Sequence, residues 1–333
     1  MSDAEYRQNS EVADLDPRLS YVIGICTRNR LDLLQRLVGS IRELRIPDSI
    51  DLEVIIVDNN DTRQVYEKDF DVPETVGLSV HHEAQPGLVY ARNALFDIAE
   101  LRGADWLLGI DDDEWLDTEW LVEWHRGTKN SESGIMVGTT TFFFQDGLHP
   151  FHPRGQFPVP IEGKRPPILG TFNYAIHRSV FGRKSGLGMR FDLHFNKSGG
   201  EDLEFMLRAM RQHNVIVTGW PHAKAYEIRS SDRASMRYEI WRGIRNQVNA
   251  YTVAARHSEL GITGYRHGVQ IVVLRSIARN ILFGTALLGL TLVKFIARRK
   301  DTGATFGQAL RRFARASAFV PFRMGKIHQE YGN

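Results

Sequence analysis

The sequence predicts an α/β protein with a mixed, mainly parallel sheet that is flanked by helices. Three observations support this fold class. Over the first 145 residues, short apolar segments rich in β-branched residues alternate with longer segments whose apolar residues recur at helical spacing. Such alternation is typical of βα units with right-handed crossovers. The chain has 333 residues, 42% hydrophobic and 25% charged, which is enough for a sizeable core.

The first predicted elements follow this alternation. The segment YVIGIC at residues 21–26 is a compact apolar run, as expected for a buried strand, and residues 31–44 place their apolar side chains on one helical face. Residues 52–58 form a second apolar run that ends in Asp58, and residues 78–83 form a shorter one. We therefore expect a strand, a helix and two further strands.

The next elements continue the pattern. Residues 88–101 have helical spacing and follow a Pro-Gly pair, and residues 106–110 are again a short apolar run. Residues 118–126 are expected to be helical and residues 134–144 to form a strand. A Gly-rich entry into a helix is expected at residues 199–213.

The segment between these elements is rich in proline. Residues 150–167 contain six of the chain's twelve prolines, which cannot continue a helix or a ladder, so we expect a loop on the substrate side. Residues 168–181 return to strand character. Ligands of open parallel sheets bind outside the carboxyl ends of the strands. Both Asp58 and the aspartates at 111–113 follow predicted strands, and a site is expected there.

Four acidic residues, Asp111, Asp112, Asp113 and Glu114, directly follow the strand predicted at 106–110. A run of charges is usually a solvated turn, and that alternative stays open. Alternate side chains of an extended segment face the same way, so Asp111 and Asp113 would point together and Asp112 elsewhere. Two converging carboxylates suit Mg²⁺ or Mn²⁺ bound with the help of substrate phosphates. The pattern predicts a divalent cation and a phosphate-bearing substrate.

Five segments occur in the order CTRNR, VIIVDNND, QPGLVYARNAL, WLLGIDDDEW and GGEDLEFMLR. Together they resemble the family 2 glycosyltransferases, inverting enzymes of the GT-A fold that use nucleotide sugars. The segment RASMRYEIWRGIRNQ and the final EYGN are similar to the bacterial exopolysaccharide branch with its succinoglycan-type glucosyltransferases. The resemblance covers about residues 20–255 well and the remainder loosely, and its motifs do not specify the sugar.

The resemblance implies a nucleotide side for the site. Asp58 would accept the N3–H of uracil or thymine, since a carboxylate only accepts; alternatively it caps a helix or forms a turn. Thr27 and Arg28 would wrap the nucleotide. Arg92 and Asn93 match the family's ARN, and Arg92 would donate to the base or the pyrophosphate unless it is an ordinary helix-surface charge.

The resemblance also implies the metal ligands. Asp113 would be the direct ligand of Mn²⁺ or Mg²⁺, which acts as a Lewis acid on the departing diphosphate, and Asp111 would face the ribose or the ion. Asp112 counts among the nucleotide-sugar-binding residues, although its side chain and that of Glu114 are expected to orient the loop. His222 is a weak candidate for a third ligand; the alternative is a structural histidine.

The catalytic base is expected within GGED. By the resemblance Asp202 is the base that deprotonates the acceptor hydroxyl, a role worth roughly 10²–10⁴-fold in rate. Glu201 would contact the acceptor or the loop, and Gly199 and Gly200 would let the backbone approach the sugar. The alternative is that the acids cap a helix N-terminus.

Four arginines, Arg233, Arg237, Arg242 and Arg245, recur at near-helical spacing and could clamp a diphosphate. The single cysteine, Cys26, excludes an internal disulfide and is expected to be a buried small side chain. His81 and His82 are expected on a strand surface. The sequence has no Q-x-x-R-W signature, which argues for transfer of single sugars, and no secretory signal, which argues for a cytosolic location.

The domain prediction follows from these motifs. Residues 1–20 are acidic and polar and are expected to be a disordered lead-in. Residues 21–255 would form the GT-A domain, with a nucleotide-binding half at 21–115 and an acceptor half at 116–255. Residues 256–333 would form a helical, basic tail at the membrane interface.

The apolar segment 280–293 carries the membrane prediction. Its fourteen residues rise about 21 Å as a helix, short of the ~30 Å hydrocarbon core. From Lys294 to Lys326, nine Lys or Arg residues accompany one acid, Asp301, which suits an anionic membrane. We expect a helix lying on the cytoplasmic face of the inner membrane, or one packed against the domain or a second subunit.

The functional hypothesis is transfer of a sugar, with UDP-glucose as the best guess for the donor, to a glycan acceptor linked to polyprenyl diphosphate, in exopolysaccharide or other cell-surface polysaccharide synthesis. No nucleic-acid partner is expected. One alternative is a sugar-1-phosphate nucleotidyltransferase, although the segment CTRNR lacks the Gly-rich loop of that class. A second alternative is a non-catalytic, membrane-associated protein that binds nucleotide sugars.

Overall fold

The computed structural model describes most of the chain. The described residues are 18–129, 131–145, 147, 149–152, 158–262 and 268–325. The lead-in predicted at 1–20 therefore lies outside the described residues, apart from its last three, of which two already belong to the first strand.

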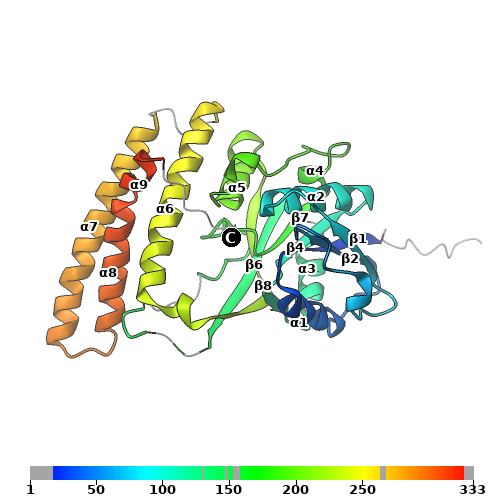
Figure 1. Cartoon of the computed structure of the whole chain (residues 1–333), viewed down its shortest axis with the longest axis horizontal. Coiled ribbons are helices and arrows are strands. Elements are labelled where there is room, and N and C mark those ends of the chain that lie inside the picture. The colour runs from blue at the N-terminus through cyan, green and yellow to red at the C-terminus, as the bar shows by residue number, and fades with distance from the viewer. Residues whose placement is uncertain are drawn as a thin grey trace, which may run out of the picture.

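One eight-stranded sheet forms the centre of the molecule (Figure 1). Its strands are β1 (Leu19–Thr27), β2 (Ile50–Asp58), β3 (Gly77–His82), β4 (Trp106–Asp111), β5 (Glu114–Leu116), β6 (Ile135–Phe144), β7 (Asn173–His177) and β8 (Val217–Arg229). Their order across the sheet is β3-β2-β1-β4-β7-β6-β8-β5. The pairs among β1 to β4 and the pair β6–β8 are parallel, whereas β7 and β5 pair antiparallel with their neighbours. The predicted mixed, mainly parallel sheet is confirmed.

Helices cover both faces of the sheet and continue beyond it. They are α1 (Leu31–Arg42), α2 (Leu88–Leu101), α3 (Trp120–Thr128), α4 (Arg178–Phe181), α5 (Glu201–Gln212), α6 (Met236–Glu259), α7 (Gly268–Ile296), α8 (Thr302–Ser317) and α9 (Phe319–Arg323). Single 3₁₀ turns are η1 (Glu67–Asp69), η2 (Leu193–Phe195) and η3 (Ser231–Ala234).

Two cores form because alternate residues of each strand point to opposite faces of the sheet. On one face, Tyr21 and Ile23 pack in the cluster that holds Trp120 of α3. On the other, Val22 packs in the cluster that holds Phe96 of α2. Since both faces are covered, the strands are apolar runs rather than alternating ones, which is why they were recognisable in the sequence.

Sequence and structure differ in three places on the acceptor side of the sheet. The strand character predicted for residues 168–181 resolves into β7 followed by α4. Two strands were not predicted: β5, because it has three residues, and β8, because its segment contains a proline and alternates weakly. Pro221 lies in the irregular stretch of β8 between Gly219 and Lys224, which pair with Val137 and Thr139 of β6. The ladder therefore resumes beyond the proline and does not need its missing N–H.

Helices α6, α7 and α8 lie side by side at one end of the molecule, as Figure 1 shows. The length expected for the apolar segment was wrong: α7 has 29 residues and rises about 43 Å, because the helix continues on both sides of residues 280–293. By length and composition it could cross a membrane, and only 22% of its most apolar window is buried. The domain boundaries expected at 115 and 255 stay a prediction.

Candidate active site

The carboxyl ends of three neighbouring strands meet at one edge of the sheet. Thr27, the last residue of β1, pairs in register with Asp58 at the end of β2, and Cys26 pairs with Asp111 at the end of β4. The residues expected to bind the nucleotide therefore do lie together. Burial raises the pKa of the Cys26 thiol to about 12, which makes it an unreactive, half-buried side chain.

Gly109 of β4 packs closely against an aromatic ring. A Cβ at this position would lie 2.1 Å from the ring of Tyr174 on the neighbouring strand β7, so only glycine fits beneath that ring. Tyr174 is 2% exposed and closes the floor of the site under the aspartates. The glycine of GIDDDEW is thus required by packing rather than by turn conformation.

Asp112 is held by residues that follow β1. Its Oδ2 accepts from Thr27 Oγ1 at 2.8 Å and its Oδ1 from Arg30 Nη1 at 2.9 Å. Arg30 also lies 3.3 Å from Asp113 Oδ2. Burial raises the pKa of Asp112, while Arg30 and Thr27 oppose the rise. Asp112 is thus tied to the residues that follow β1. Because Asp112 and Asp113 lie in a turn and Arg30 contacts both, the extended alternation expected over residues 111–113 does not hold.

The other carboxylates of this loop face a further acid on β8. Glu114 is 1% exposed and stands directly opposite Glu227 in the β5–β8 pair. Burial, followed by the charge of Asp111, raises the pKa of Glu114 well above its ordinary value. Desolvation and the charges of Asp113, Asp112 and Glu227 likewise raise the pKa of Asp111, although Arg92 opposes them. We call Asp111, Asp113, Glu114 and Glu227 the strand-end carboxylates.

Arg92 joins this group to the second pair of acids. Its Nη1 lies 2.8 Å from Glu201 Oε1, and both side chains are 7% exposed. Its Nη2 lies 3.5 Å from Asp111 Oδ1 and 3.4 Å from the carbonyl of Thr171. The alternative of an ordinary surface charge is thereby wrong. Arg92 bridges segments that are 109 residues apart in the chain.

Asp202 lies in the first turn of α5. The preceding Gly200 has φ +91°, a left-handed conformation that glycine tolerates, and it turns the chain into the helix. Burial raises the pKa of Asp202, against the opposing charge of Arg92. Its Oδ2 lies 3.4 Å from the position of a Cβ on Gly170. A carboxylate of raised pKa is a stronger base than a solvated one.

Asp58 is fully buried and uses both oxygens within its own loop. Oδ1 accepts from the backbone and side chain of Asn60, and Oδ2 accepts from the backbone N–H groups of Gln64 and Val65. In this conformation Asp58 orders the loop 59–65. Beside it lies an open cleft of about 510 Å³. The lining residues are Asn29, Arg30, Leu31, Asp32, Leu33, Asn60, Gln64 and Val65.

Several other predicted residues lie at the edges of this region. Arg28 is exposed and pairs with Asp61 at 3.0 Å. Asn93 binds the backbone of Phe191 through both amide atoms and so joins α2 to the segment before η2. Of the predicted strand-surface pair, His82 binds the carbonyl of Asn60 at 2.8 Å.

The position of His222 does not support its expected role as a third metal ligand. Its Nε2 lies 3.0 Å from Glu162 Oε2, and its ring packs against Trp220. It stands five residues before Glu227 on β8, about 16 Å along an extended strand. Within the part of the chain that is described, no three His, Cys, Asp or Glu side chains are grouped to hold a metal ion.

Of the four arginines expected to clamp a diphosphate, Arg233 contacts the strand-end carboxylates. Arg233 lies 2.9 Å from Glu227 Oε1 and 3.9 Å from Asp113 Oδ2. Arg237 is exposed, and Arg245 stacks on Trp241 with its charge felt by Asp202. Arg242 lies near enough to Arg229 and Glu239 for their charges to act on its pKa. The arginines thus divide between different parts of the molecule.

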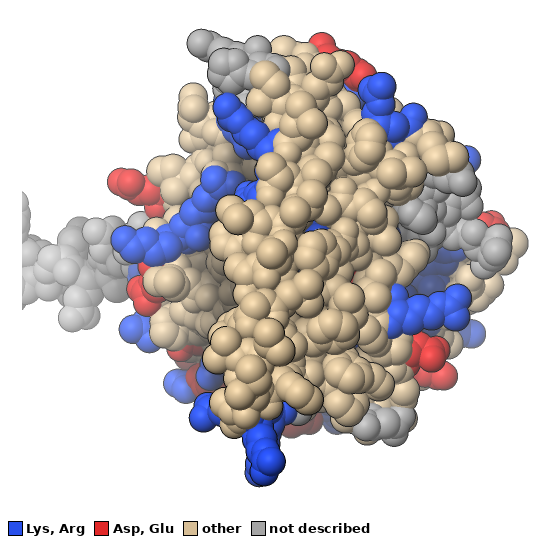
Figure 2. Space-filling view, turned by 90° about the vertical axis from the view of Figure 1, so that its left-hand side faces the viewer, with Lys and Arg blue, Asp and Glu red and all other residues tan. Residues whose placement is uncertain are grey.

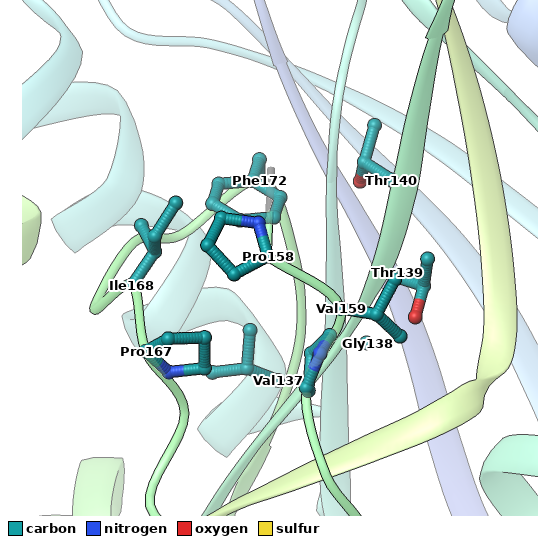
Figure 3. A pocket seen from close by; sticks show the side chains of 10 residues that line it. Val137, Gly138, Thr139, Thr140, Pro158, Val159, Pro167, Ile168 and Phe172 are labelled. Carbon is teal, nitrogen blue, oxygen red and sulfur yellow. The ribbon is translucent and has the colours of Figure 1, made fainter. Parts of the chain in front are cut away.

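The proline-rich segment packs against the sheet beside Asp202. Figure 3 shows Pro158, Val159, Pro167, Ile168 and Phe172 closing over Val137 to Thr140 of β6. The cavity between them has a volume of about 10 Å³, room for about one water molecule. Of the loop predicted at 150–167, residues 153–157 lie outside the described residues.

Two contributors to the site were missed in the sequence. Arg30 follows Arg28 in CTRNR and clamps two aspartates, which its spacing from the strand end could have indicated. Glu227 was missed because β8 was not predicted, so nothing placed its carboxylate opposite Glu114.

Comparison with known proteins identifies the family of the chain. The model of Glycosyl transferase family 2 matches residues 22–190, which is 169 of the 333 residues. The chain belongs to this family. The matched range contains the strand ends, Arg92 and Asp111–Asp113, whereas Asp202 lies beyond it. The family 2 chain is a glycosyltransferase, which excludes the nucleotidyltransferase and non-catalytic alternatives.

Individual proteins are similar to this family 2 chain at lower identity. The succinoglycan biosynthesis protein ExoM of Rhizobium meliloti (strain 1021) is 27% identical over 235 residues, covering 67% of this chain and 72% of that protein. The crystal structure of S. aureus TarS 1-349 in complex with UDP-GlcNAc has a TM-score of 0.50 at 13% identity, covering 92% of this chain and 93% of that one. This likeness supports the predicted GT-A fold.

Proposed function

We propose that the protein transfers a sugar from a nucleotide sugar to a glycan acceptor with inversion at the anomeric carbon. One observation carries the proposal: Arg92 contacts Asp111 at the strand ends and Glu201 beside Asp202. A donor bound at the strand ends would therefore have its reactive carbon next to a basic carboxylate. Such proximity of donor and base is what a single displacement requires.

The proposed donor is a UDP-sugar, with glucose as the sugar. TarS has been crystallised with UDP-GlcNAc, and the relative ExoM is a succinoglycan biosynthesis protein. The cleft beside Asp58 is the proposed nucleoside pocket. Since both oxygens of Asp58 already accept from the loop, a uracil N3–H would share or replace one of these bonds. Thr27, Arg28 and Asp112 would support the residues that line this pocket, as Asp112 does by accepting a hydrogen bond from Arg30.

Enzymes of this family generally use a divalent metal, and we propose Mn²⁺ or Mg²⁺ at Asp113 and Asp111. Both carboxylates stay accessible, with side chains 18% and 44% exposed. Burial, followed by the charges of Asp113 and other acids, raises the pKa of Asp111, and a cation would favour its ionised form. Magnesium commonly takes one or two protein carboxylates plus substrate phosphates, so no third protein ligand is required. When bound, the cation would stabilise negative charge on the leaving diphosphate.

In the proposed reaction Asp202 removes the proton from the acceptor hydroxyl. The oxygen attacks the anomeric carbon, the bond to the diphosphate breaks, and the nucleoside diphosphate leaves with the bonding electron pair. Arg92 would hold Glu201 aligned beside the base, and Arg30 and Arg233 would hold the aspartate loop. The proline-rich segment beside Gly170 would limit the access of water to Asp202.

The acceptor is proposed to be a membrane-linked glycan, within exopolysaccharide synthesis, on the cytoplasmic face of the inner membrane. Figure 2 shows the face that α7 presents: uncharged side chains fill its centre, and Lys and Arg gather at its edges. Exposed apolar residues of this helix include Leu274, Ile281, Leu282, Phe283, Leu288, Leu290, Leu292, Val293, Phe295 and Ile296. This combination is typical of helices that lie in an anionic membrane interface.

Interfacial binding is proposed rather than a span because of α8. The two helices pack along one another, with Gly284 of α7 against the ring of Phe313. A spanning α7 would draw Arg311, Arg312 and Arg315 of α8 into hydrocarbon, which is costly. A helix lying flat leaves these charges outside the hydrocarbon core.

A panel of nucleotide diphosphates and nucleotide sugars, measured by thermal shift with and without Mn²⁺, tests the donor and the metal together. UDP and UDP-glucose should raise the melting temperature more than the CDP and GDP compounds, and Mn²⁺ should increase the effect. A preference for CDP, or shifts indifferent to Mn²⁺ and Mg²⁺, would contradict the proposal.

A further inference from the structure

A second concentration of positive charge lies between α6 and α8. Arg242 belongs to α6, and Arg311 and Arg315 belong to α8; we call these three residues the arginine cluster. Arg311 Nη1 donates to Glu239 Oε2 at 2.9 Å. Glu239 precedes Arg242 by three residues on α6, and its charge acts on Arg242 and Arg315 as well. One carboxylate is thus shared by three guanidinium groups.

Gly243 makes this convergence possible. A Cβ at this position would lie 3.1 Å from Arg311 Cγ and 3.7 Å from Arg315 Cγ. The stems of both α8 arginines therefore lie across the surface of α6 at the glycine. Their headgroups are brought to the same side of α6 as Arg242, which gives a compact donor array rather than scattered surface charges.

His152 adds an unpartnered polar group to this array. It is 4% exposed, and neither of its ring nitrogens has a hydrogen-bond partner among the described residues. Its Nε2 lies 3.8 Å from Glu239 Oε1, and the charges of Arg311, Arg229 and Arg242 act on it. Burial lowers the pKa of His152, so the neutral ring keeps one N–H to donate. A ring N–H without a partner among the described residues can donate to an anion placed beside the cluster.

The electrostatics of the cluster favour an anion. Burial, followed by the charges of Arg311 and Arg312, lowers the pKa of Arg315 to about 10, and burial with Arg229 lowers that of Arg242. An anion placed among these groups would offset both effects. Phosphate groups match arginine especially well, because the guanidinium fork donates two parallel hydrogen bonds to their oxygens.

The position of the cluster relates it to the base. On the same helix, Asn249 packs against Gly200, with its Cβ 3.0 Å from the position of a glycine Cβ, at the start of the helix that carries Asp202. Arg242 and Asn249 are 249 − 242 = 7 residues apart, about 10 Å along α6. A phosphate on the cluster would thus be separated from the base by the length of a short glycan.

We propose that the arginine cluster and His152 bind the phosphate or diphosphate group through which a membrane-linked acceptor is attached to its lipid. The proposal rests on the proposed function and deepens it, because it assigns the acceptor its own anion site. The donor diphosphate belongs to the strand ends, where Arg233 lies beside Asp113. Helix α7 packs on the same α8, and its exposed apolar face would hold the lipid at the membrane.

Isothermal titration of the full chain with farnesyl diphosphate, inorganic pyrophosphate and farnesol tests the site. Saturating UDP is present throughout to fill the donor site. We expect the wild type to bind both diphosphates and to bind farnesol at least tenfold more weakly. Arg315→Gln and Arg311→Gln should each weaken both diphosphates at least tenfold, and Arg315→Lys should have a smaller effect. The control is Arg323→Gln, which removes an exposed arginine of α9 and should change nothing.

Each other outcome has a defined meaning. If Arg315→Gln, Arg315→Lys and Arg311→Gln all bind farnesyl diphosphate like the wild type, the site is wrong. If these variants lose UDP affinity in parallel, the cluster belongs to the donor site and the inference fails. If they lose binding only to phosphatidylglycerol vesicles, the cluster is a lipid-headgroup site and the inference also fails. A wild type that binds no UDP contradicts the proposed function, whatever farnesyl diphosphate does.

Discussion

Two groups of acidic side chains lie on either side of Arg92, and their negative charge is compensated differently. The strand-end carboxylates include Glu114 and Glu227, which stand opposite one another on paired strands. The second group, Glu201 and Asp202, lies in the first turn of α5, where a helix N-terminus favours negative charge. Glu201 is also paired with Arg92 at 2.8 Å. In the first group, burial and neighbouring acids raise the pKa of Asp111 and Glu114 despite the arginines around them, whereas Glu201 of the second group is paired directly with a buried arginine.

This difference indicates different chemistry. Grouped carboxylates with a raised pKa at a strand end are suited to a cation that arrives with its substrate. A carboxylate beside an already neutralised partner can instead gain and lose a proton alone, which is what a base requires. If the comparison is right, replacing a member of one group should impair a different step from replacing a member of the other.

The largest expected effect is that of Asp202→Asn. The amide keeps the shape but cannot take the acceptor proton, so kcat should fall by roughly 10²–10⁴-fold. UDP affinity in the presence of Mn²⁺ should stay at the wild-type value. Because the pKa of Asp202 is raised, the wild-type rate should fall with decreasing pH above the ordinary aspartate range near 3.8, as the base becomes protonated.

The matched control for this variant is Asp48→Asn, an exposed aspartate remote from the site. Single-turnover rates with saturating donor separate chemistry from binding. A wild-type rate in Asp202→Asn would remove Asp202 from the mechanism. An equal loss of UDP affinity would instead move it into the donor site and end the distinction between the two groups.

Asp113→Ala should affect the opposite step. Loss of a residue that only supports a metal ligand can lower metal affinity by roughly 100-fold. Loss of Asp113, a direct ligand, should weaken Mn²⁺-dependent UDP binding by more than that. Metal-free UDP binding should change little, since the nucleoside cleft is lined by other residues. Titration calorimetry with Mn²⁺ and with EDTA measures both values, and Asp48→Ala is the control. Equal affinities of variant and wild type with Mn²⁺ would refute the metal assignment.

The parts of this comparison that were predictable from the sequence have a common physical origin. Buried parallel strands are continuous apolar runs, so β1, β2 and β4 and the aspartates that follow them could be placed. Asp112 and Asp113, however, form a turn after β4 rather than the extended segment on which their expected alternation rested. The GGED segment starts a helix, as its glycines and acids indicated.

The remaining parts depend on contacts distant in the sequence. Arg92 meets Glu201 across 109 residues, and Glu114 meets Glu227 through a strand that contains a proline. No local periodicity encodes such pairs. Asp58 shows the same limit in part: a turn was an open alternative and Oδ1 does accept from the N–H of Asn60, but the bonds from Gln64 and Val65 to Oδ2 could not be foreseen. The full length of α7 was missed because only its charge-free portion was considered.

Arg92→Gln tests the link between the two groups. Removing one partner of a buried ion pair leaves the other charge uncompensated. We therefore expect the free energy of unfolding to fall by about 3 kcal/mol. Urea denaturation measures this loss, with exposed Arg126→Gln as the control. A second substitution, Glu201→Gln, should restore part of the lost stability in the double variant. No loss in the single variant would mean that Arg92 does not compensate these acids in solution.

Glu114→Gln should have the smallest effect and the opposite sign. Since the pKa of Glu114 is raised in the folded protein, ionising it there opposes folding at neutral pH, and the amide removes that penalty. The amide oxygen can still accept from the N–H of Asp111, as Glu114 Oε2 does at 3.3 Å. We expect a gain of roughly 0.5–1 kcal/mol, the size of a like-charge pair opposed on two strands. The gain should vanish as the pH falls below the ordinary glutamate range, where the unfolded chain is protonated as well.

Exposed Glu74→Gln is the control for Glu114→Gln. A variant less stable than the wild type at pH 7 would show that Arg229 and Arg233, which pair with Glu227, already neutralise the strand-end group without a metal.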